Sequence, residues 1–155
     1  MNSIPRELLE EIRRHAVEEY PFECCGLVLG VSGKNNADAV RPVANIQNRL
    51  HESDPAAHPR DARTAYFMDP GQVMKVFREA MEKGLIIKTF YHSHPEHDAY
   101  FSAEDRKMAV LEDEPAYPEA SYLVVSVYDR KVKQEALFAW NPQTRNYEER
   151  EFTPC

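Results

Sequence analysis

The sequence predicts an α+β protein built on a mixed β-sheet. Helical and strand segments interleave along the chain without the regular alternation that produces a purely parallel sheet. The helical segments carry apolar residues at i, i+3 or i+4 spacing, and the strands are short apolar or alternating runs between turn residues. The 155 residues contain no repeat, low-complexity tract or linker, so we expect one domain over residues 1–155.

The first half of the chain is expected to contain one helix, a hairpin and a long loop. Residues 5–19 show a helical apolar period, and residues 25–30 form an apolar run bounded by glycine that indicates a buried strand. Residues 37–46 can pair with that strand as a hairpin. Residues 47–64 have no period and contain two prolines, so we expect a loop, followed by a short strand over residues 65–68.

The second half is expected to run helix, strand, helix and three strands. Asp69 can cap the first of these helices and Gly84 can end it. The expected ranges are 70–83, 86–94, 102–112, 121–129, 131–140 and 146–152.

The composition is that of an acidic globular protein. Lysine and arginine total 19 against 26 aspartate and glutamate residues, a net charge of −7, which disfavours nucleic acid or an anionic membrane as partner. No run approaches the ~18 apolar residues of a membrane span, and the N-terminus lacks the apolar core of a signal peptide. The three cysteines, two of them adjacent, form no disulfide framework and indicate a reducing cytoplasm.

The segment from Tyr91 to Asp105 contains the residues that point to chemistry. His92 and His94 lie two apart on a strand, so they face the same way, roughly 6.5–7 Å apart along the chain. Asp105 falls in the first turn of the next helix and becomes a third ligand if that turn folds back over the strand end. Two imidazoles and one carboxylate leave a fourth tetrahedral position for water, as in catalytic zinc sites.

Hydrolysis at such a centre also needs a group that takes the proton of the water. Glu23, just before the strand 25–30, is the best placed acidic residue by pattern. Each residue also has a purely structural interpretation. The two histidines can be coincidence, Ser102 and Asp105 match a helix capping box, and Glu23 can be a solvated charge. The chemical interpretation depends on their occurring together.

Other candidates are weaker. Neither Cys24 nor Cys25 is marked as activated, and Cys25 is expected to be a small buried residue. His97 and Asp98 are expected at the rim of the site, and His15 is expected to be solvated. The acidic and histidine residues of the long loop match no ligand spacing; they are His51, Glu52, His58 and Asp61.

Three motifs together resemble the JAMM (MPN-plus) metalloprotease family. They are E-x-C-G at residues 23–26, H-S-H-P at residues 92–95 and F-S-x-x-D at residues 101–105. The H-x-H-x7-S-x2-D spacing of the family is matched without insertion, and the order of elements resembles the whole MPN fold. The small stand-alone prokaryotic members are the most similar. The resemblance implies a curved mixed sheet flanked by helices, with a cytidine-deaminase-like general layout.

The resemblance also implies a role for each site residue. One zinc per chain would be held by His92, His94 and Asp105, with Glu23 as general acid and base. Ser102 would donate a hydrogen bond to the oxyanion of the intermediate. The activity would be that of a zinc-dependent peptidase or isopeptidase. It would cleave an amide bond at the C-terminal tail of a ubiquitin-like or sulfur-carrier protein.

Two alternatives of other classes remain open from the sequence. One is a module that binds ubiquitin-like tails without cutting them. The other is a RadC-type DNA-associated protein, against which the acidic charge and the lack of a basic stripe argue. The loop 47–64 would either grip the tail, with strand 65–68 pairing to it, or be an inert surface loop. The sequence does not specify the oligomeric state.

Overall fold

The frame of the protein is a six-stranded mixed sheet, seen in a computed structural model that describes residues 3–155. The strand order is β3-β2-β4-β7-β8-β9, in which β4 and β7 run parallel and the other neighbours antiparallel. These strands are β2 (Cys25–Gly30), β3 (Ala39–Val43), β4 (Ile86–Pro95), β7 (Ser121–Tyr128), β8 (Lys131–Asn141) and β9 (Asn146–Arg150). Together with the helices, this sheet confirms the predicted α+β class.

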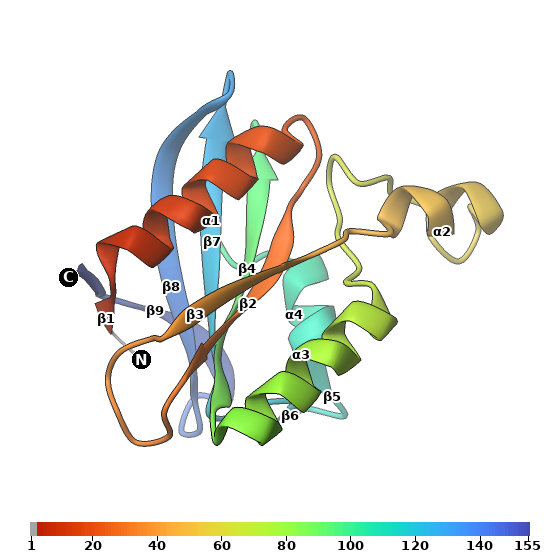
Figure 1. Ribbon diagram of the computed structural model, residues 1–155. Coiled ribbons are helices and arrows are strands. Elements are labelled where there is room, and N and C mark those ends of the chain that lie inside the picture. The colour runs from red at the N-terminus through yellow and green to blue at the C-terminus, as the bar shows by residue number, and fades with distance from the viewer. Residues whose placement is uncertain (1–2) are drawn as a thin grey trace.

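Helices cover both faces of the sheet (Figure 1). α1 (Arg6–Glu19) crosses one face, while α3 (Pro70–Lys83) and α4 (Ala103–Ala109) lie on the other. α2 (Gln47–Ser53) extends away from the sheet. In the described part of the chain no helix is long and apolar enough to cross a membrane.

Two small strand pairs complete the fold. The first is parallel and joins the ends of the described chain, and the second is antiparallel and follows α4. The pairs are β1 (Ser3–Ile4) with β10 (Thr153–Pro154), and β5 (Val110–Leu111) with β6 (Glu114–Pro115).

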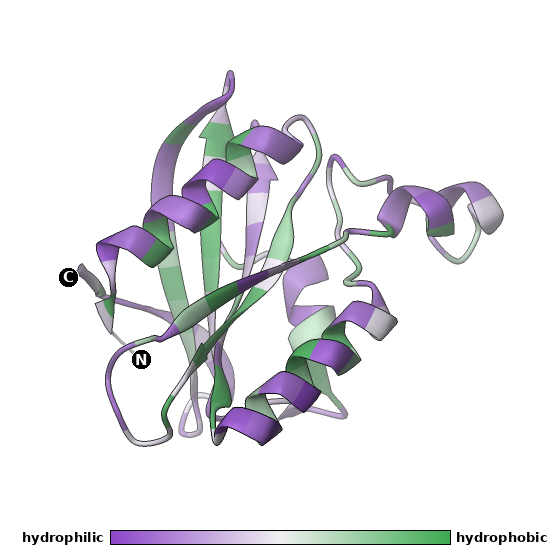
Figure 2. Cartoon of the chain, viewed as in Figure 1, coloured by the Kyte–Doolittle hydropathy of each residue, from purple (hydrophilic) through white to green (hydrophobic). Residues whose placement is uncertain are grey.

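The core has two halves because side chains alternate across the sheet. Phe90 of β4 packs in the half that includes Val76 of α3, whereas Tyr91 packs in the half that includes Leu9 and Ile12 of α1. Figure 2 shows the result, with hydrophobic strands at the centre and hydrophilic residues along the outer sides of the helices. By the same alternation, the side chain of His92 lies on the α3 side of the sheet, and the side chains of its two neighbours in sequence lie on the α1 side.

Most predicted elements are confirmed within a few residues. α1, β2, β4 and the three C-terminal strands lie where the sequence places them. The side chain of Asp69 caps α3 by accepting a hydrogen bond from the Gln72 amide at 3.1 Å. Gly84 ends α3 with a left-handed φ of 68°, which glycine adopts without strain.

The prediction of a loop over residues 47–64 is wrong for its first seven residues, which form α2. α2 has no apolar period because it does not pack on the core and is anchored through polar groups. The side chain of Gln47 donates to the Arg60 carbonyl at 2.9 Å. The Asn48 side chain accepts from the Ala62 amide at 2.8 Å.

Two further boundaries differ from the prediction. Residues 65–68 form no strand; an isolated bridge joins Met68 to Asn45. The Asn45 side chain, rather than a neighbouring strand, makes hydrogen bonds to the backbone of this stretch. The helix expected over residues 102–112 ends at Ala109. It ends there because residues 110–111 pair with β6 instead of continuing the helix.

Gly26 generates a prediction about stability. A Cβ at Gly26 would lie 2.3 Å from the ring of Tyr91, its partner on β4, and that ring is fully buried and hydrogen bonded to His15. We therefore expect Gly26→Ala to lower the free energy of unfolding by about 1–3 kcal/mol, measured by denaturant titration. In a Tyr91→Leu background the same change should cost much less. An equal cost in both backgrounds would contradict this explanation.

Candidate metal centre

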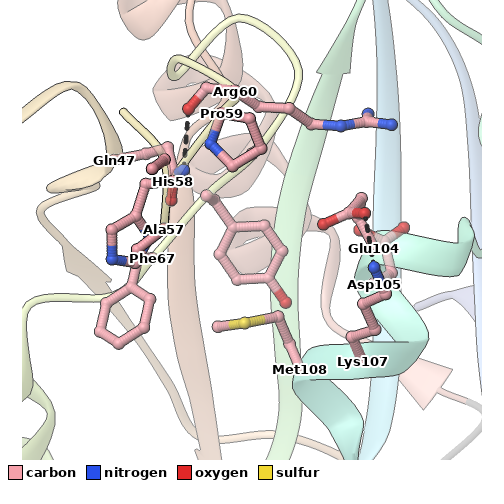
Figure 3. Close-up of a pocket in the computed structure, with 13 residues that line it drawn as sticks. Gln47, Ala57, His58, Pro59, Arg60, Phe67, Glu104, Asp105, Lys107 and Met108 are labelled. Carbon is pink, nitrogen blue, oxygen red and sulfur yellow. Dashed lines mark hydrogen bonds and ion pairs between the residues drawn. The ribbon is translucent and has the colours of Figure 1, made fainter. Parts of the chain in front are cut away.

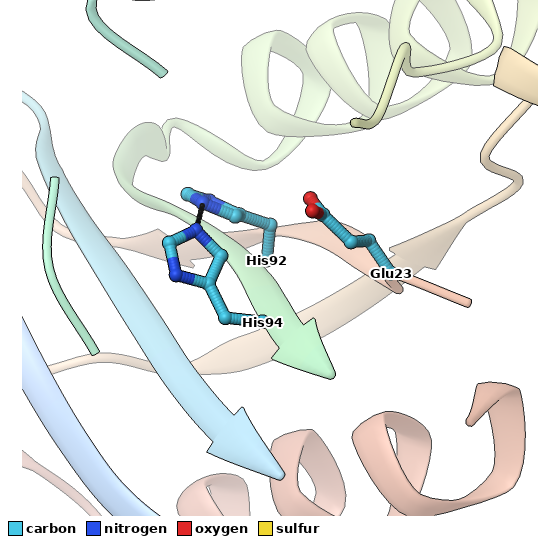
Figure 4. A group of neighbouring side chains, drawn as sticks. All are labelled: Glu23, His92 and His94. Carbon is cyan, nitrogen blue, oxygen red and sulfur yellow. Dashed lines mark hydrogen bonds between the residues drawn. The ribbon is translucent and has the colours of Figure 1, made fainter. Parts of the chain in front are cut away.

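The predicted site residues converge where β4 ends beside the start of β2. His92 pairs with Cys25 across the sheet, so Glu23 lies next to the two histidines. Figure 4 shows the Glu23 carboxyl directed towards the space beside the imidazoles of His92 and His94. Asp105 joins them from the first turn of α4. All four residues are at most 5 % exposed, so Glu23 is not a solvated charge.

The imidazoles and Asp105 have the spacing of a metal ligand set. Nε2 of His92 lies 3.0 Å from Oδ1 of Asp105, and Nε2 of His94 lies 3.2 Å from Oδ2. The two Nε2 atoms are 3.2 Å apart. Around a tetrahedral ion with bonds of about 2.0–2.1 Å, neighbouring ligand atoms are about 3.3 Å apart. These three side chains therefore fit one metal ion.

The tautomer of His94 supports the same conclusion. Its Nδ1 lies 2.9 Å from the carbonyl oxygen of Asp98, which can only accept, so Nδ1 carries the proton of the neutral ring. Nε2 then presents a lone pair to Oδ2 of Asp105. In the neutral ring these two atoms are both acceptors, and a cation bound between them would satisfy both. The site can therefore hold a metal ion.

Two carboxylates are candidates for the third ligand position. Ligand atoms of Glu23, His92 and His94 lie within 4.8 Å of one another, which makes that trio a second possible set. Asp105 contacts both imidazoles, whereas Oε1 of Glu23 is buried without a hydrogen-bond partner among the described residues. The contacts favour Asp105 as the ligand and leave Glu23 facing the site.

Burial sets the protonation of the site. It raises the pKa of Glu23 well above its ordinary value, and the nearby Asp105 raises it further while Arg60 opposes both. Burial also lowers the pKa of His92, so this ring is neutral at pH 7, the form that binds metals. For Asp105, burial raises the pKa but the imidazoles more than offset it, so the carboxyl ionises below its ordinary range.

Ser102 and Asp105 form the capping box that the sequence suggests. The Ser102 hydroxyl oxygen accepts from the Asp105 amide at 3.0 Å, and the Ser102 amide donates to Oδ2 of Asp105 at 2.9 Å. The helix cap thus aims the Asp105 carboxylate at the imidazoles. The same two residues therefore cap the helix and place Asp105 beside the histidines, so the helix-cap interpretation and the metal-site interpretation of this motif are both compatible with the structure.

Two cavities open beside the site. The larger has a volume of about 470 Å³ and lies between the loop after α2 and the helix α4 (Figure 3). It reaches Asp105, and its walls include Pro59, Tyr66 and Met108. The smaller, about 50 Å³, has a polar lining that includes Glu23 and Ser102.

The sequence analysis missed two residues that support the site. Asn45 donates from Nδ2 to the carbonyls of Glu23 at 2.9 Å and Ala65 at 3.2 Å. Its Oδ1 accepts from the amides of Gln47 and Phe67, each at 3.0 Å. A single asparagine after a strand looks like any turn residue, so no local signal marks it.

Tyr66 is the second missed residue. Its ring stacks on that of His92 with centroids 4.5 Å apart and an interplanar angle of 24°. This contact fixes the orientation of the imidazole. Tyr66 comes from the stretch that Asn45 holds, so Asn45 positions both Glu23 and the ring that covers His92.

The weaker candidates have other surroundings. Burial raises the pKa of Cys24 to about 12 and that of Cys25 well above its ordinary value, so neither is a thiolate nucleophile at neutral pH. The prediction that His15 is solvated is wrong, because its side chain is only 13 % exposed and its Nδ1 lies 2.8 Å from the Tyr91 hydroxyl, and burial lowers its pKa. His97 lines the smaller cavity, as expected for a rim residue.

The side chains of Asp98 and of the four candidates between residues 47 and 64 take no part in the cluster. Asp98 is exposed, and its side chain pairs with Lys133. Nδ1 of His51, on α2, contacts the carbonyl oxygen of His58 at 2.7 Å. The group of possible metal ligands within residues 3–155 contains none of these four residues.

Comparison with known proteins finds relatives among prokaryotic JAB-domain proteins. The family of prokaryotic homologues of the JAB domain matches residues 5–142. A desampylase from Haloferax volcanii is 32% identical over 128 residues, which cover 83% of this chain and 79% of the relative. A CysO-cysteine peptidase from Mycobacterium tuberculosis is 28% identical over 126 residues, which cover 81% and 73%.

Solved structures share the fold. The solution structure of a protein from Desulfitobacterium hafniense matches with a TM-score of 0.74 and 23% identity, covering 100% of this chain and 93% of the other. A JAB1/MPN domain protein from Archaeoglobus fulgidus matches with a TM-score of 0.57 and 18% identity, covering 98% and 96%. These matches confirm the predicted MPN architecture.

The four hydrogen bonds of Asn45 lead to a prediction. Asn45→Ala should lower the free energy of unfolding by about 2–4 kcal/mol, because four backbone groups lose their partner. Asn48→Ala is the matched control, since it removes one bond and should cost about 0.5–1.5 kcal/mol. Denaturant unfolding measures both values. Equal costs would show that Asn45 does not organise this region.

Proposed function

The chain belongs to the family of prokaryotic JAB-domain proteins, and from this we propose that it is a zinc-dependent peptidase. Its proposed reaction is hydrolysis of an amide bond at the C-terminal tail of a ubiquitin-like or sulfur-carrier protein. The observation that carries the proposal is the convergence of His92, His94 and Asp105 within 3.2 Å beside the buried carboxyl of Glu23. The similarity to a desampylase and to a CysO-cysteine peptidase supports the choice of substrate.

The proposed metal is one zinc ion per chain, held by His92, His94 and Asp105. Two imidazole nitrogens and one carboxylate oxygen with a position left open suit catalytic zinc. When bound, zinc supplies Lewis-acid activation of water for attack on a carbonyl carbon. The hydrogen bond from Nδ1 of His94 to the Asp98 carbonyl orients that ring for its role.

Glu23 is the proposed general acid and base. A carboxyl whose pKa is raised by burial can take a proton from water and then give it to the leaving amine near neutral pH. The backbone around Glu23 is fixed for this task. Its amide donates to the Ala62 carbonyl at 2.7 Å, and its carbonyl accepts from Asn45.

Ser102 is the proposed donor to the oxyanion. Its hydroxyl oxygen already accepts from the Asp105 amide, so the hydroxyl proton is free to be donated elsewhere. Ser102 shares the lining of the smaller cavity with Glu23 and His94. A fixed donor there can stabilise negative charge that develops on the scissile carbonyl.

The larger cavity is the proposed groove for the substrate tail. Small side chains, including those of Ala56, Ala57 and Ala65, leave room for an extended chain that ends in glycine. Asn45 holds the backbone of Ala65 and Phe67 on one edge. The backbone groups of Tyr66 alternate to the opposite edge, where they can pair with the tail by β-augmentation.

Residues 1–155 form a single catalytic domain in this proposal, and the proposed compartment is the cytoplasm. Cys24, Cys25 and Cys155 are all free, which fits a reducing environment.

The zinc assignment predicts metal content. Purified protein should contain about one zinc per chain by elemental analysis, and the His92→Ala/His94→Ala double variant should contain almost none, because it loses two of three ligands. His51→Ala, which removes a histidine of α2 outside the proposed ligand set, should retain zinc. Full zinc content in the double variant would overturn the assignment.

The proton-transfer role predicts a separation of activity from metal binding. Glu23→Gln keeps the size of the side chain but cannot accept a proton, so amide hydrolysis should fall by roughly 10²- to 10⁴-fold. Its zinc content and thermal midpoint should stay near those of the wild type. Glu19→Gln, at an exposed position of α1, should keep full activity. A wild-type rate for Glu23→Gln would remove Glu23 from the mechanism.

A further inference from the structure

The turn that follows β4 holds the outer edge of the His94 imidazole. The carbonyl oxygen of Asp98 lies 2.9 Å from Nδ1 of His94, and it also accepts a hydrogen bond from the Tyr100 amide at 3.0 Å. Because Asp98 contributes a backbone oxygen, this contact depends on the path of the turn rather than on the side chain at position 98. The contacts that fix residues 96–98 therefore also fix the direction in which Nε2 of His94 points.

This turn needs support from outside to keep its shape. Glu96 has a φ of 59°, in the left-handed region that disfavours residues with a Cβ atom, and such a conformation persists when the surrounding structure holds it. β7, the parallel neighbour of β4, supplies two contacts that do so. The Glu96 amide donates to the carbonyl oxygen of Val127 at 2.7 Å, and the Ser126 hydroxyl donates to the carbonyl oxygen of His97 at 2.5 Å.

The register of the sheet places Ser126 for this contact. Ser126 is the partner of His94 across the β4–β7 ladder, so the two side chains lie on the same face of the sheet. Ser126 is fully buried, and the bond to His97 is the one that its hydroxyl makes within residues 3–155. A buried hydroxyl is costly without a partner, so this bond constrains both the serine and the turn.

Two further contacts reach the turn from the protein surface. The Asp98 side chain accepts a hydrogen bond from the Tyr128 hydroxyl at 2.9 Å and pairs with Lys133 at 3.0 Å. The side chains of Asp98 and Lys133 are 62 % and 53 % exposed, so water screens their ion pair and it contributes little. The buried bond from Ser126 is therefore the stronger constraint on the turn.

We propose that Ser126 is a positioning residue for the metal centre: by fixing residues 96–98, it holds the Asp98 carbonyl where it orients His94 with Nε2 towards the metal. The role is indirect, because the hydroxyl acts through two backbone groups of the turn. This assignment rests on the proposed zinc-dependent function and adds a residue of β7 on which the zinc site depends.

Ser126→Ala removes the hydroxyl, and Ser121→Ala is the matched control. Ser121 is also a buried serine of β7 whose hydroxyl donates to a carbonyl oxygen of β4, that of Lys88 at 3.3 Å, but it lies at the start of the strand. Both changes should lower the thermal midpoint of the metal-free protein by about 2–4 °C, since each removes the bonding of a buried hydroxyl. Zinc affinity, measured by competition with a chelator, should fall roughly 10- to 100-fold in Ser126→Ala and stay near the wild-type value in Ser121→Ala.

A second measurement follows the ring without metal. In NMR spectra of the metal-free wild type, the proton on Nδ1 of His94 should be protected from solvent exchange, because it is bonded to the Asp98 carbonyl and the residue is buried. Ser126→Ala should lose this protected signal, and Ser121→Ala should keep it.

Unchanged zinc affinity in Ser126→Ala, equal losses of affinity in the two variants, or a His94 signal that persists in Ser126→Ala would overturn the role of Ser126 while the zinc-dependent function stands. A wild type that binds no zinc would show instead that the proposed function is wrong. The NMR measurement needs no metal, so it decides even then whether Ser126 orients the ring.

Discussion

The pairing of β2 with β4 is the constraint on which the site depends. It sets Cys25 opposite His92, and the contact continues past the last ladder pair through Ser93. The Ser93 hydroxyl accepts from the Cys24 amide at 2.8 Å, and the Ser93 amide donates to the Cys24 carbonyl at 3.1 Å. Ser93 lies between the two histidines in sequence, so these bonds hold Glu23 beside both rings. A slip of one residue would turn both imidazoles to the α1 face.

Around this pairing, the residues that stabilise the fold also orient the chemistry. The capping box that begins α4 aims Asp105 at the imidazoles, and the stacking of Tyr66 fixes the plane of His92. Asn45 connects the Glu23 backbone to the stretch that carries Tyr66. Because these contacts are buried and share partners, the geometry of the site is set by folding itself, as effective catalytic centres require.

The arrangement also divides the surroundings of the site by chemical character. On the Asp105 side, the cavity of about 470 Å³ has a mixed lining in which small side chains, such as that of Ala57, occur beside charged ones, such as that of Lys107. On the Glu23 side, the cavity of about 50 Å³ has a mostly polar lining that includes Arg60. The loop between α2 and α3 contributes residues to both cavities.

The sequence by itself determined the main elements, the likeness to the MPN fold and the residues that converge at the site. Periodicity is local, so α1, β2, α3 and β4 follow from neighbouring residues, and the facing of His92 and His94 follows from strand alternation. The tertiary structure decided the burial of Glu23, the contact of Asp105 with both rings, the helix α2, and the positions of Asn45, Tyr66 and Arg60. Hydrogen bonds and ring stacking between segments far apart in the sequence produce no periodic pattern of residues. They form only when folding brings those segments together, so the sequence alone does not predict them.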